Sequence, residues 1–348
     1  MISKHMLNTF LENAYQLKEN HPIRIVIILF MLAALYLGIL NAVELEAGIS
    51  KSFHIDSQTY ADPEITKELC YRAFEGKVTD FFRGGYFCTS YILGPEISIL
   101  INAILYCVTT VILMDTLIRA RLSLGTTLLI TVIIFAPYRA HLAIHLLKDS
   151  LIHFFVCLGL FYRGGALWAI PLMLFRGPAA LLYFGSLFSI KKIMVITAAV
   201  LVVLIPMFWA SLIAKLEILM QGNNNMAVYQ DYDTVPTFQD MGLFGDFLRF
   251  MLWPGLLITG AFLITSPSIF FIPIAIIGLP SVILIILSNK SSRLLSQLIK
   301  MYFSIGVIAY IMPGYTSFIR YSYPFISIVL VAIIIEAYKR KKEIAGDQ

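Results

Sequence analysis

Ionisable residues crowd into one short stretch, 136–153, between two strongly apolar runs. They are one arginine, three histidines, one lysine and one aspartate: Arg139, His141, His145, Lys148, Asp149 and His153. As a helix, this stretch places four of these side chains four residues apart, so that they drift slowly round one face. An arginine, lysine or aspartate at membrane depth costs roughly 2.5–3.5 kcal/mol on insertion scales and is a functional candidate by default. We therefore expect binding or catalysis here.

The spacing of His141 and His145 raises the question of a metal site, because helical zinc sites use histidines four residues apart. The glutamate of an HExxH motif is absent, however. The four side chains also rotate by about 120° in total at about 100° per residue, and His153 would lie about a turn inside the membrane. The pattern favours a hydrogen-bonded lining of a polar cavity. A divalent metal at His141 and His145 is the alternative, and no cofactor is assigned.

Composition places these residues in a membrane protein. Of 348 residues, 59% are hydrophobic and 14% are charged, and the mean hydropathy is +0.83. Soluble domains have about 45–50% apolar and about 25% charged residues. Apolar runs of roughly 20 residues recur between positions 25 and 338, and irregular backbone cannot face lipid. We predict one all-α integral membrane domain over 1–348, a bundle of about 9–11 segments that includes one or two re-entrant half-helices.

Basic residues beside the apolar runs indicate the topology, because cytoplasmic loops carry an excess of lysine and arginine. We expect an inner-membrane, multi-pass protein with both termini in the cytoplasm. The net charge of +5 is then a topology signal and does not indicate a nucleic-acid partner. The expected parts are a cytoplasmic N-terminus (1–24), an uncleaved first span (25–43), a long external loop (45–91), a second span (93–117), a short third span (124–136), a fourth span from Asp149, a polar external loop (214–246) and a cytoplasmic basic tail (339–348).

Two stretches resist a simple count of spans. Two apolar half-runs in 166–190 flank Arg176-Gly-Pro178, which predicts a re-entrant hairpin, with one kinked span as the alternative. The polar loop 214–246 is expected to be external, and the segment that follows the later apolar runs is expected to be cytoplasmic. The chain between them must therefore cross the membrane an odd number of times. Either 278–280 makes a second re-entrant turn, or the Arg176 region is a full span. Between them, 238–252 has the pattern of an interfacial amphipathic helix.

Four cysteines divide into two pairs. Cys107 and Cys157 lie in apolar runs and are expected to be small buried hydrophobes. Cys70 and Cys88 both lie in the predicted external loop, where an oxidising compartment permits a disulfide. Two free thiols in that loop are the alternative.

The predicted external side collects both acidic and basic side chains. Its acids include Asp56 and Asp149, and its cations are Arg139, Lys148, Arg176 and Arg320. Such a set suits a reaction in which a carboxylate deprotonates a hydroxyl nucleophile while cations stabilise a departing phosphate. A bundle with this face would act on a lipid-linked substrate whose head group sits at the interface.

Four motifs, in order, make the chain similar to the GT-C class of membrane glycosyltransferases, which use polyprenyl-phosphate-linked sugars. They are Ile55-Asp56-Ser-Gln-Thr-Tyr60, Lys148-Asp149, Arg176-Gly-Pro178 and Arg320-Tyr-Ser-Tyr-Pro324. The resemblance implies that Asp56 is a catalytic base or orients the acceptor. It also implies that Lys148, Arg176 and Arg320 contact the lipid phosphate.

The expected function is transfer of a sugar from a polyprenyl-phosphate donor to a cell-envelope glycan or lipid acceptor. Asp56 and Asp149 are the predicted catalytic residues, and the predicted substrate contacts are Lys148, Arg139, Arg176, Arg320, Tyr60 and His145. Partners are the lipid-linked sugar, its acceptor and the bilayer. A polymerase of lipid-linked repeat units, distantly similar to O-antigen and exopolysaccharide polymerases, is the alternative within enzymes. A transporter or flippase is the alternative from another class, although the chain lacks matching halves.

Each motif also has a structural interpretation without chemistry. Asp56 can be a solvated loop acid. Lys148 and Asp149 can mark a helix end at the interface, with the lysine reaching toward the head groups. Arg320 can be a topology anchor within an aromatic belt.

Overall fold

The structure is a computed structural model of the chain, and it is described here over part of its length. The described residues are 16, 19–49, 55–75, 78–161, 165–168, 170–172, 238, 241–259, 302–309, 318–319, 322, 328, 331–332 and 334–335. They are mostly helical and contain no strand. The chain divides into two compact units, one of residues 1–180 with 324–348 and the other of residues 181–323. Each is treated separately below.

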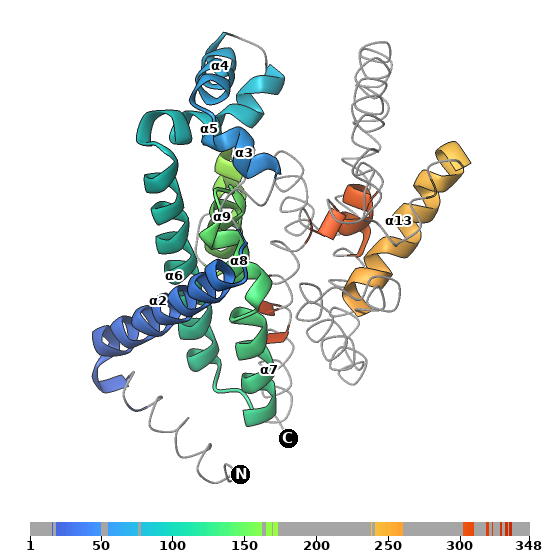
Figure 1. Cartoon of the computed structure of the whole chain (residues 1–348). Helices are drawn as coiled ribbons and strands as arrows, with labels where there is room; N and C mark the ends of the chain where they lie inside the picture. Colours follow the sequence, from blue (N-terminus) through green and yellow to red (C-terminus); the bar gives the residue numbers. More distant parts are fainter. Residues whose placement is uncertain are drawn as a thin grey trace. The chain divides into compact units, whose positions relative to one another are not determined.

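Three helical stretches of the described residues are long and apolar enough to cross a membrane: Pro22–Glu46, Pro95–Ala120 and Leu124–Ile144. All three belong to the first unit (Figure 1). They correspond to the first three predicted spans. The fourth predicted span, from Asp149, is described as the shorter apolar helix Asp149–Phe161. Most of the other predicted segments lie outside the described residues, and so does the complete bundle.

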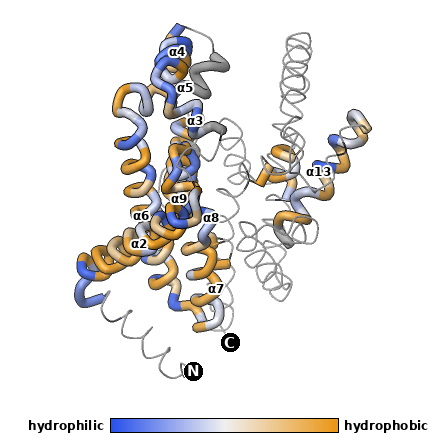
Figure 2. The backbone as a smooth tube through the Cα atoms, in the orientation of Figure 1, coloured by the Kyte–Doolittle hydropathy of each residue, from blue (hydrophilic) through white to orange (hydrophobic). Residues whose placement is uncertain are grey.

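Helix α2 (Pro22–Glu46) has one buried stripe and a broad apolar surface. The stripe recurs at helical spacing and consists of Ile25, Leu29, Ala33, Leu37 and Glu44. Large apolar side chains such as Met31 and Leu35 are exposed on the rest of the helix, and Figure 2 shows α2 as predominantly hydrophobic. A helix with apolar side chains on its outer surface matches a lipid environment.

Helix α6 (Pro95–Ala120) buries several polar side chains together with apolar ones. Its buried polar side chains are Ser98, Asn102, Thr109 and Thr110. The three hydroxyl groups donate to the carbonyl oxygen four residues earlier in the same helix. Asn102 is the exception, because its side chain reaches other helices.

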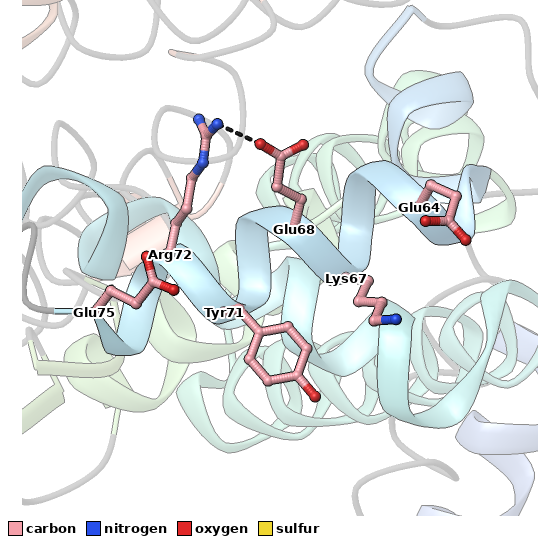
Figure 3. A pocket seen from close by; sticks show the side chains of 6 residues that line it. All are labelled: Glu64, Lys67, Glu68, Tyr71, Arg72 and Glu75. Carbon is pink, nitrogen blue, oxygen red and sulfur yellow. Dashed lines mark hydrogen bonds and ion pairs between the residues drawn. The ribbon is translucent and has the colours of Figure 1, made fainter.

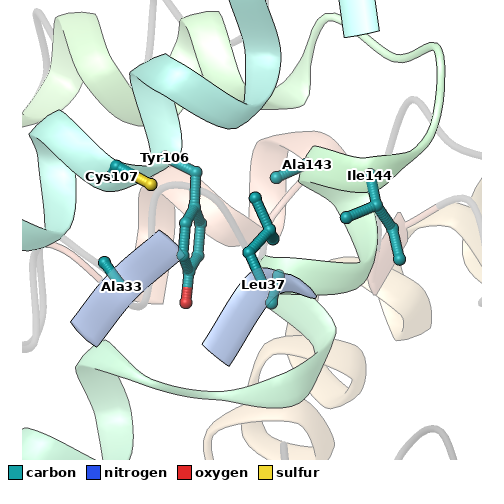
Figure 4. Close-up of a cluster of buried hydrophobic side chains, with 7 residues drawn as sticks. Ala33, Leu37, Tyr106, Cys107, Ala143 and Ile144 are labelled. Atoms are coloured by element: carbon teal, nitrogen blue, oxygen red, sulfur yellow. The ribbon is translucent and has the colours of Figure 1, made fainter. Parts of the chain in front are cut away.

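Helices α2, α6 and α8 meet in a core of small and medium side chains. Ala33 and Leu37 of α2 pack with Tyr106 of α6 and with Ala140 and Ala143 of α8. Figure 4 shows the Tyr106 ring beside Ala33 and Leu37. Alanines on α2 and α8 let the helices approach closely, the usual solution where lipid removes the hydrophobic drive for association.

The third span is interrupted at a proline. Helix α7 (Leu124–Ile134) is followed by Phe135 as its C-cap, and α8 (Pro137–Ile144) begins with Pro137 in its first turn. Proline has no amide hydrogen and clashes with the preceding turn, so the α7 helix cannot run through it. The predicted interruption at Pro137 is confirmed, whereas the span-length apolar stretch continues beyond the predicted end at 136 to Ile144. Helix α9 (Asp149–Phe161) follows and packs against α6.

The predicted external loop, 45–91, is largely helical. It contains α3 (Ile55–Ala61), α4 (Pro63–Phe74) and α5 (Val78–Leu93). Asp62 caps α4, because its side chain accepts hydrogen bonds from the amides of Glu64 and Ile65, and Pro63 occupies the first turn. Figure 2 shows α4 as mostly hydrophilic. We call α3, α4 and α5 the helical cap.

A disulfide joins Cys70 of α4 to Cys88 of α5. Of the two alternatives that the sequence leaves open, the structure has the bridge. Cys107 and Cys157 are free and buried, as expected. The bridge ties together two helices that also pack along their length, so the cap is covalently reinforced.

The second unit is described mainly through α13 (Gly242–Thr259), which contains Pro254. The amphipathic helix was predicted over 238–252, so the observed helix begins and ends later than expected. It continues into the next apolar run through Pro254 and Gly255. Arg249 pairs with Asp246 one turn earlier and lies near the Trp253 ring, which in turn contacts Phe318.

Candidate functional site

The stretch 136–153 is not one helix. Helix α8 ends at Ile144, His145 has an extended backbone with φ −99° and ψ 159°, and α9 begins at Asp149. The expectation of one four-membered stripe is therefore wrong. His141 and His145 lie at the end of α8, while Asp149 and His153 lie one turn apart on α9.

Asn102 of α6 holds this helix break in place. Its side-chain amide donates to the carbonyl oxygens of His145 at 3.2 Å and Leu147 at 2.6 Å, and to the Tyr86 hydroxyl at 3.1 Å. Two amide hydrogens are thus shared among three acceptors. Carbonyls released by a helix end need such partners when they are buried. Asn102 therefore fixes the direction in which the chain leaves α8 and enters α9.

Lys148 and Asp149 sit at this break and are both withdrawn from solvent. The relative exposure is 9% for Lys148 and 0% for Asp149. The Lys148 carbonyl accepts from the amide of Ile152, which places Asp149 in the first turn of α9, where the helix dipole favours a carboxylate. A solvated helix end, the structural interpretation of this motif, does not fit such burial. We call Tyr86, Asn102, Lys148 and Asp149 the break cluster.

The helical cap packs directly on the break. Tyr60 of α3, Tyr86 of α5 and Leu146 of the break form one buried cluster, with the Tyr60 and Tyr86 rings 4.8 Å apart edge to face. The Ser90 hydroxyl donates to the Tyr60 carbonyl at 2.7 Å and fastens α3 to α5. Tyr60 was predicted to bind substrate. Its side chain is 4% exposed and supports the cap in this structure.

The electrostatics of Tyr86 connect the cap to Asp149. Burial raises the pKa of the Tyr86 phenol above its ordinary value, and the Asn102 hydrogen bond opposes that rise. The negative charge of Asp149 raises the pKa further. The phenol therefore stays protonated and adds a neutral polar group beside the buried carboxylate.

Arg139 lies on α8 and faces α6. Its guanidinium donates to the Thr110 hydroxyl and stacks over the Tyr106 ring at 4.4 Å. The side chain is 1% exposed, and its Nε and Nη1 atoms have no hydrogen-bond partner. Among the described residues no carboxylate balances this charge. Arg139 is therefore a buried cation with unused donors, about one to two helical turns along α6 from Asn102.

A second polar cluster joins α2 to the end of α8. The Glu44 carboxylate lies 2.8 Å from Nδ1 of His141 and 3.0 Å from Nε2 of His145. All three residues are buried. Within the described residues this is a group whose donor atoms could hold a metal ion, all lying within 4.8 Å of one another. The expected cavity lining and the metal alternative both involve these histidines.

An open surface on α4 carries many charges but forms no comparable site. It is lined by Glu64, Lys67, Glu68, Tyr71, Arg72 and Glu75, all from the same helix (Figure 3). Arg72 and Glu68 pair with each other and remain largely exposed. Exposed pairs of this kind contribute little to stability, and this surface is the solvated face of the cap.

Three predicted site residues are not placed by the structure. Arg176 and Arg320 lie outside the described residues. Asp56 belongs to the backbone of α3, but its side chain is not described. Their predicted roles stay predictions.

Three residues of these clusters were missed in the sequence. Glu44 could have been found, because it continues the buried α2 stripe seven residues after Leu37. Asn102 is a lone amide in a long apolar run, which is a signal of a polar contact between spans. Tyr86 has no distinguishing pattern.

Comparisons of the chain with protein-family models, with curated proteins and with solved structures find no match.

Proposed function

We propose that the protein is a membrane glycosyltransferase that moves a sugar from a polyprenyl-phosphate carrier to a hydroxyl group of a cell-envelope acceptor. The observation that carries the proposal is the burial of Lys148 and Asp149 together at the break between α8 and α9, beneath the helical cap. Burying an acidic and a basic side chain at one helix start costs free energy, so this pair of residues points to a function.

We infer the side of the membrane on which the break cluster lies from the disulfide in the helical cap. Disulfides persist outside the cytoplasm, so the Cys70–Cys88 bridge supports an external position for the cap and for the break on which it packs. Arg119 and Arg121, at the other end of α6, then lie on the cytoplasmic side in accordance with the positive-inside rule. Polyprenyl-phosphate sugars presented at the outer surface would meet this face.

The proposed chemistry needs one proton acceptor and at least one cation. The acceptor hydroxyl attacks the anomeric carbon, the bond from that carbon to the phosphate oxygen breaks, and polyprenyl phosphate leaves with the bonding electrons. A carboxylate takes the hydroxyl proton, either Asp149 or the Asp56 that the resemblance implies. Lys148 and Arg139 stabilise the negative charge that develops on the leaving phosphate.

The test is transfer by the purified full-length protein in liposomes. Labelled polyprenyl-phosphate sugars are offered with simple lipid and glycan acceptors, and the products are separated by size. One added sugar supports a transferase, and a ladder of repeat units from lipid-linked oligosaccharides supports the polymerase variant of the same chemistry. Movement of the intact lipid-linked sugar across the bilayer without transfer would contradict the proposal and favour a flippase.

A further inference from the structure

We propose that Glu44, His141 and His145 bind a divalent transition-metal ion of the zinc type, which fastens the first span to the end of α8. The site is separate from the proposed sugar transfer and does not depend on it. It joins residues 97 and 101 positions apart in the chain.

The donor set has the chemistry of a zinc site. Two imidazole nitrogens and one carboxylate are a common ligand combination for zinc, and imidazole also suits iron, nickel and copper. Hard ions such as magnesium and calcium prefer all-oxygen sites. Within this set the nitrogen donors outnumber the carboxylate, so we infer a transition metal.

The geometry lies close to that required. Metal–ligand bonds of about 2.0–2.1 Å in a tetrahedron separate the ligand atoms by about 3.3 Å. Oε1 of Glu44 lies 2.8 Å from Nδ1 of His141, and Oε2 lies 3.0 Å from Nε2 of His145. Each carboxylate oxygen faces a different imidazole, and the donor atoms of the three side chains lie within 4.8 Å of one another. The three side chains would supply three ligands of a tetrahedral ion and leave the fourth position for a water molecule.

Burial and charge argue for a bound cation. The relative exposure of the side chains is 8% for Glu44, 4% for His141 and 2% for His145. Burying the Glu44 carboxylate in apolar surroundings carries a penalty of several kcal/mol unless the charge is compensated. A divalent ion coordinated by Glu44 and the two histidines would compensate it. The alternative is a hydrogen-bonded group of the same three side chains that binds no metal.

The surrounding packing gives the ion a structural role. Helices α2 and α8 approach through Ala33, Ala140 and Ala143, and Glu44 lies further along the buried stripe of α2 than these contacts. His145 is also the residue that caps the C-terminal end of α8. A metal at this position would fix both the crossing of the first span and the start of the helix break.

The experiment measures metal in the full-length protein purified in detergent through a tag without histidine. We expect about one zinc per chain by elemental mass spectrometry in the wild type. Glu44→Gln and His145→Asn should weaken zinc affinity by at least about 100-fold, because even losses outside the ligand set reach that size. Glu46→Gln, an exposed glutamate two residues away on α2, is the matched control and should retain the metal.

A second measurement keeps the test decisive if a variant folds poorly. The wild-type protein is stripped with a chelator and titrated with Co²⁺, which should give the visible absorption of a four-coordinate nitrogen and oxygen site at one equivalent. Added Zn²⁺ should raise the melting temperature of the stripped wild type. Zinc content below about 0.1 per chain, with no cobalt absorption and no thermal shift, would overturn the proposal and leave the hydrogen-bonded group.

Discussion

The side-chain amide of Asn102 donates to the carbonyl oxygen of Leu147 over 2.6 Å, although the two residues are 45 positions apart. This bond and its companion to His145 hold open the break at which Lys148 and Asp149 lie. The polar residues of 136–153 therefore depend on a different helix for their arrangement.

Replacing Asn102 by leucine should destabilise the protein by about 2–4 kcal/mol, because two buried carbonyls lose their donor. The measurement is the melting temperature in detergent. Ser98→Ala on the same helix is the control, since the Ser98 hydroxyl bonds only within α6. If both variants melted alike, the proposed role of Asn102 would be wrong.

The disulfide predicts a definite thiol count. The unreduced, denatured protein should have two reactive thiols, Cys107 and Cys157, and four after reduction. Four reactive thiols before reduction would contradict the bridge. Replacing Cys70 and Cys88 by serine should lower stability by about 2–4 kcal/mol, because the bridge closes a short loop in the unfolded chain.

The two ends of α6 should lie on opposite sides of the membrane. Its 26 residues span about 39 Å, more than the roughly 30 Å of hydrocarbon. We expect an impermeant maleimide added outside intact spheroplasts to label Glu64→Cys on the cap but not Ser123→Cys beyond the far end of α6. Labelling of both, or of Ser123→Cys alone, would refute the proposed orientation.

Arg139→Met should separate stability from activity. Removing a buried cation that lacks a carboxylate partner among the described residues should leave the melting temperature unchanged or higher. Sugar transfer should fall by about 100-fold or more, since the leaving phosphate loses a cation. Arg72→Met on the exposed face of α4 is the control. Transfer by Arg139→Met at the wild-type rate would remove Arg139 from the proposed site.

The apolar helices could be predicted from sequence because hydropathy and proline act locally. The second span was expected over 93–117 and is observed as Pro95–Ala120. The stop at Pro137 follows from the missing amide hydrogen of proline. Asp62 and Pro63 are also a local signal for the start of α4, but the polar composition of 45–91 favours the loop predicted there.

The candidate site could not be predicted in the same way, because its contacts are distant in sequence. The helical period of 136–153 gives no sign that Asn102 would interrupt it at His145. Glu44 lies between the predicted first span (25–43) and the predicted external loop (45–91), and its place beside His141 depends on how α2 crosses α8. Such crossings are set by packing between helices, which the spacing of residues within one helix does not encode.

The initial rate of sugar transfer by Asp149→Asn tests the central claim most directly. Asp115→Asn is the matched control, an aspartate of α6 that pairs with Arg119 at the opposite end of that helix. Asp149→Asn should transfer at least about 100-fold more slowly than the wild type, the usual loss when a carboxylate that handles a proton is removed, while Asp115→Asn stays within about twofold. Wild-type transfer by Asp149→Asn, in a protein that melts normally, would contradict the assignment of chemistry to the break between α8 and α9.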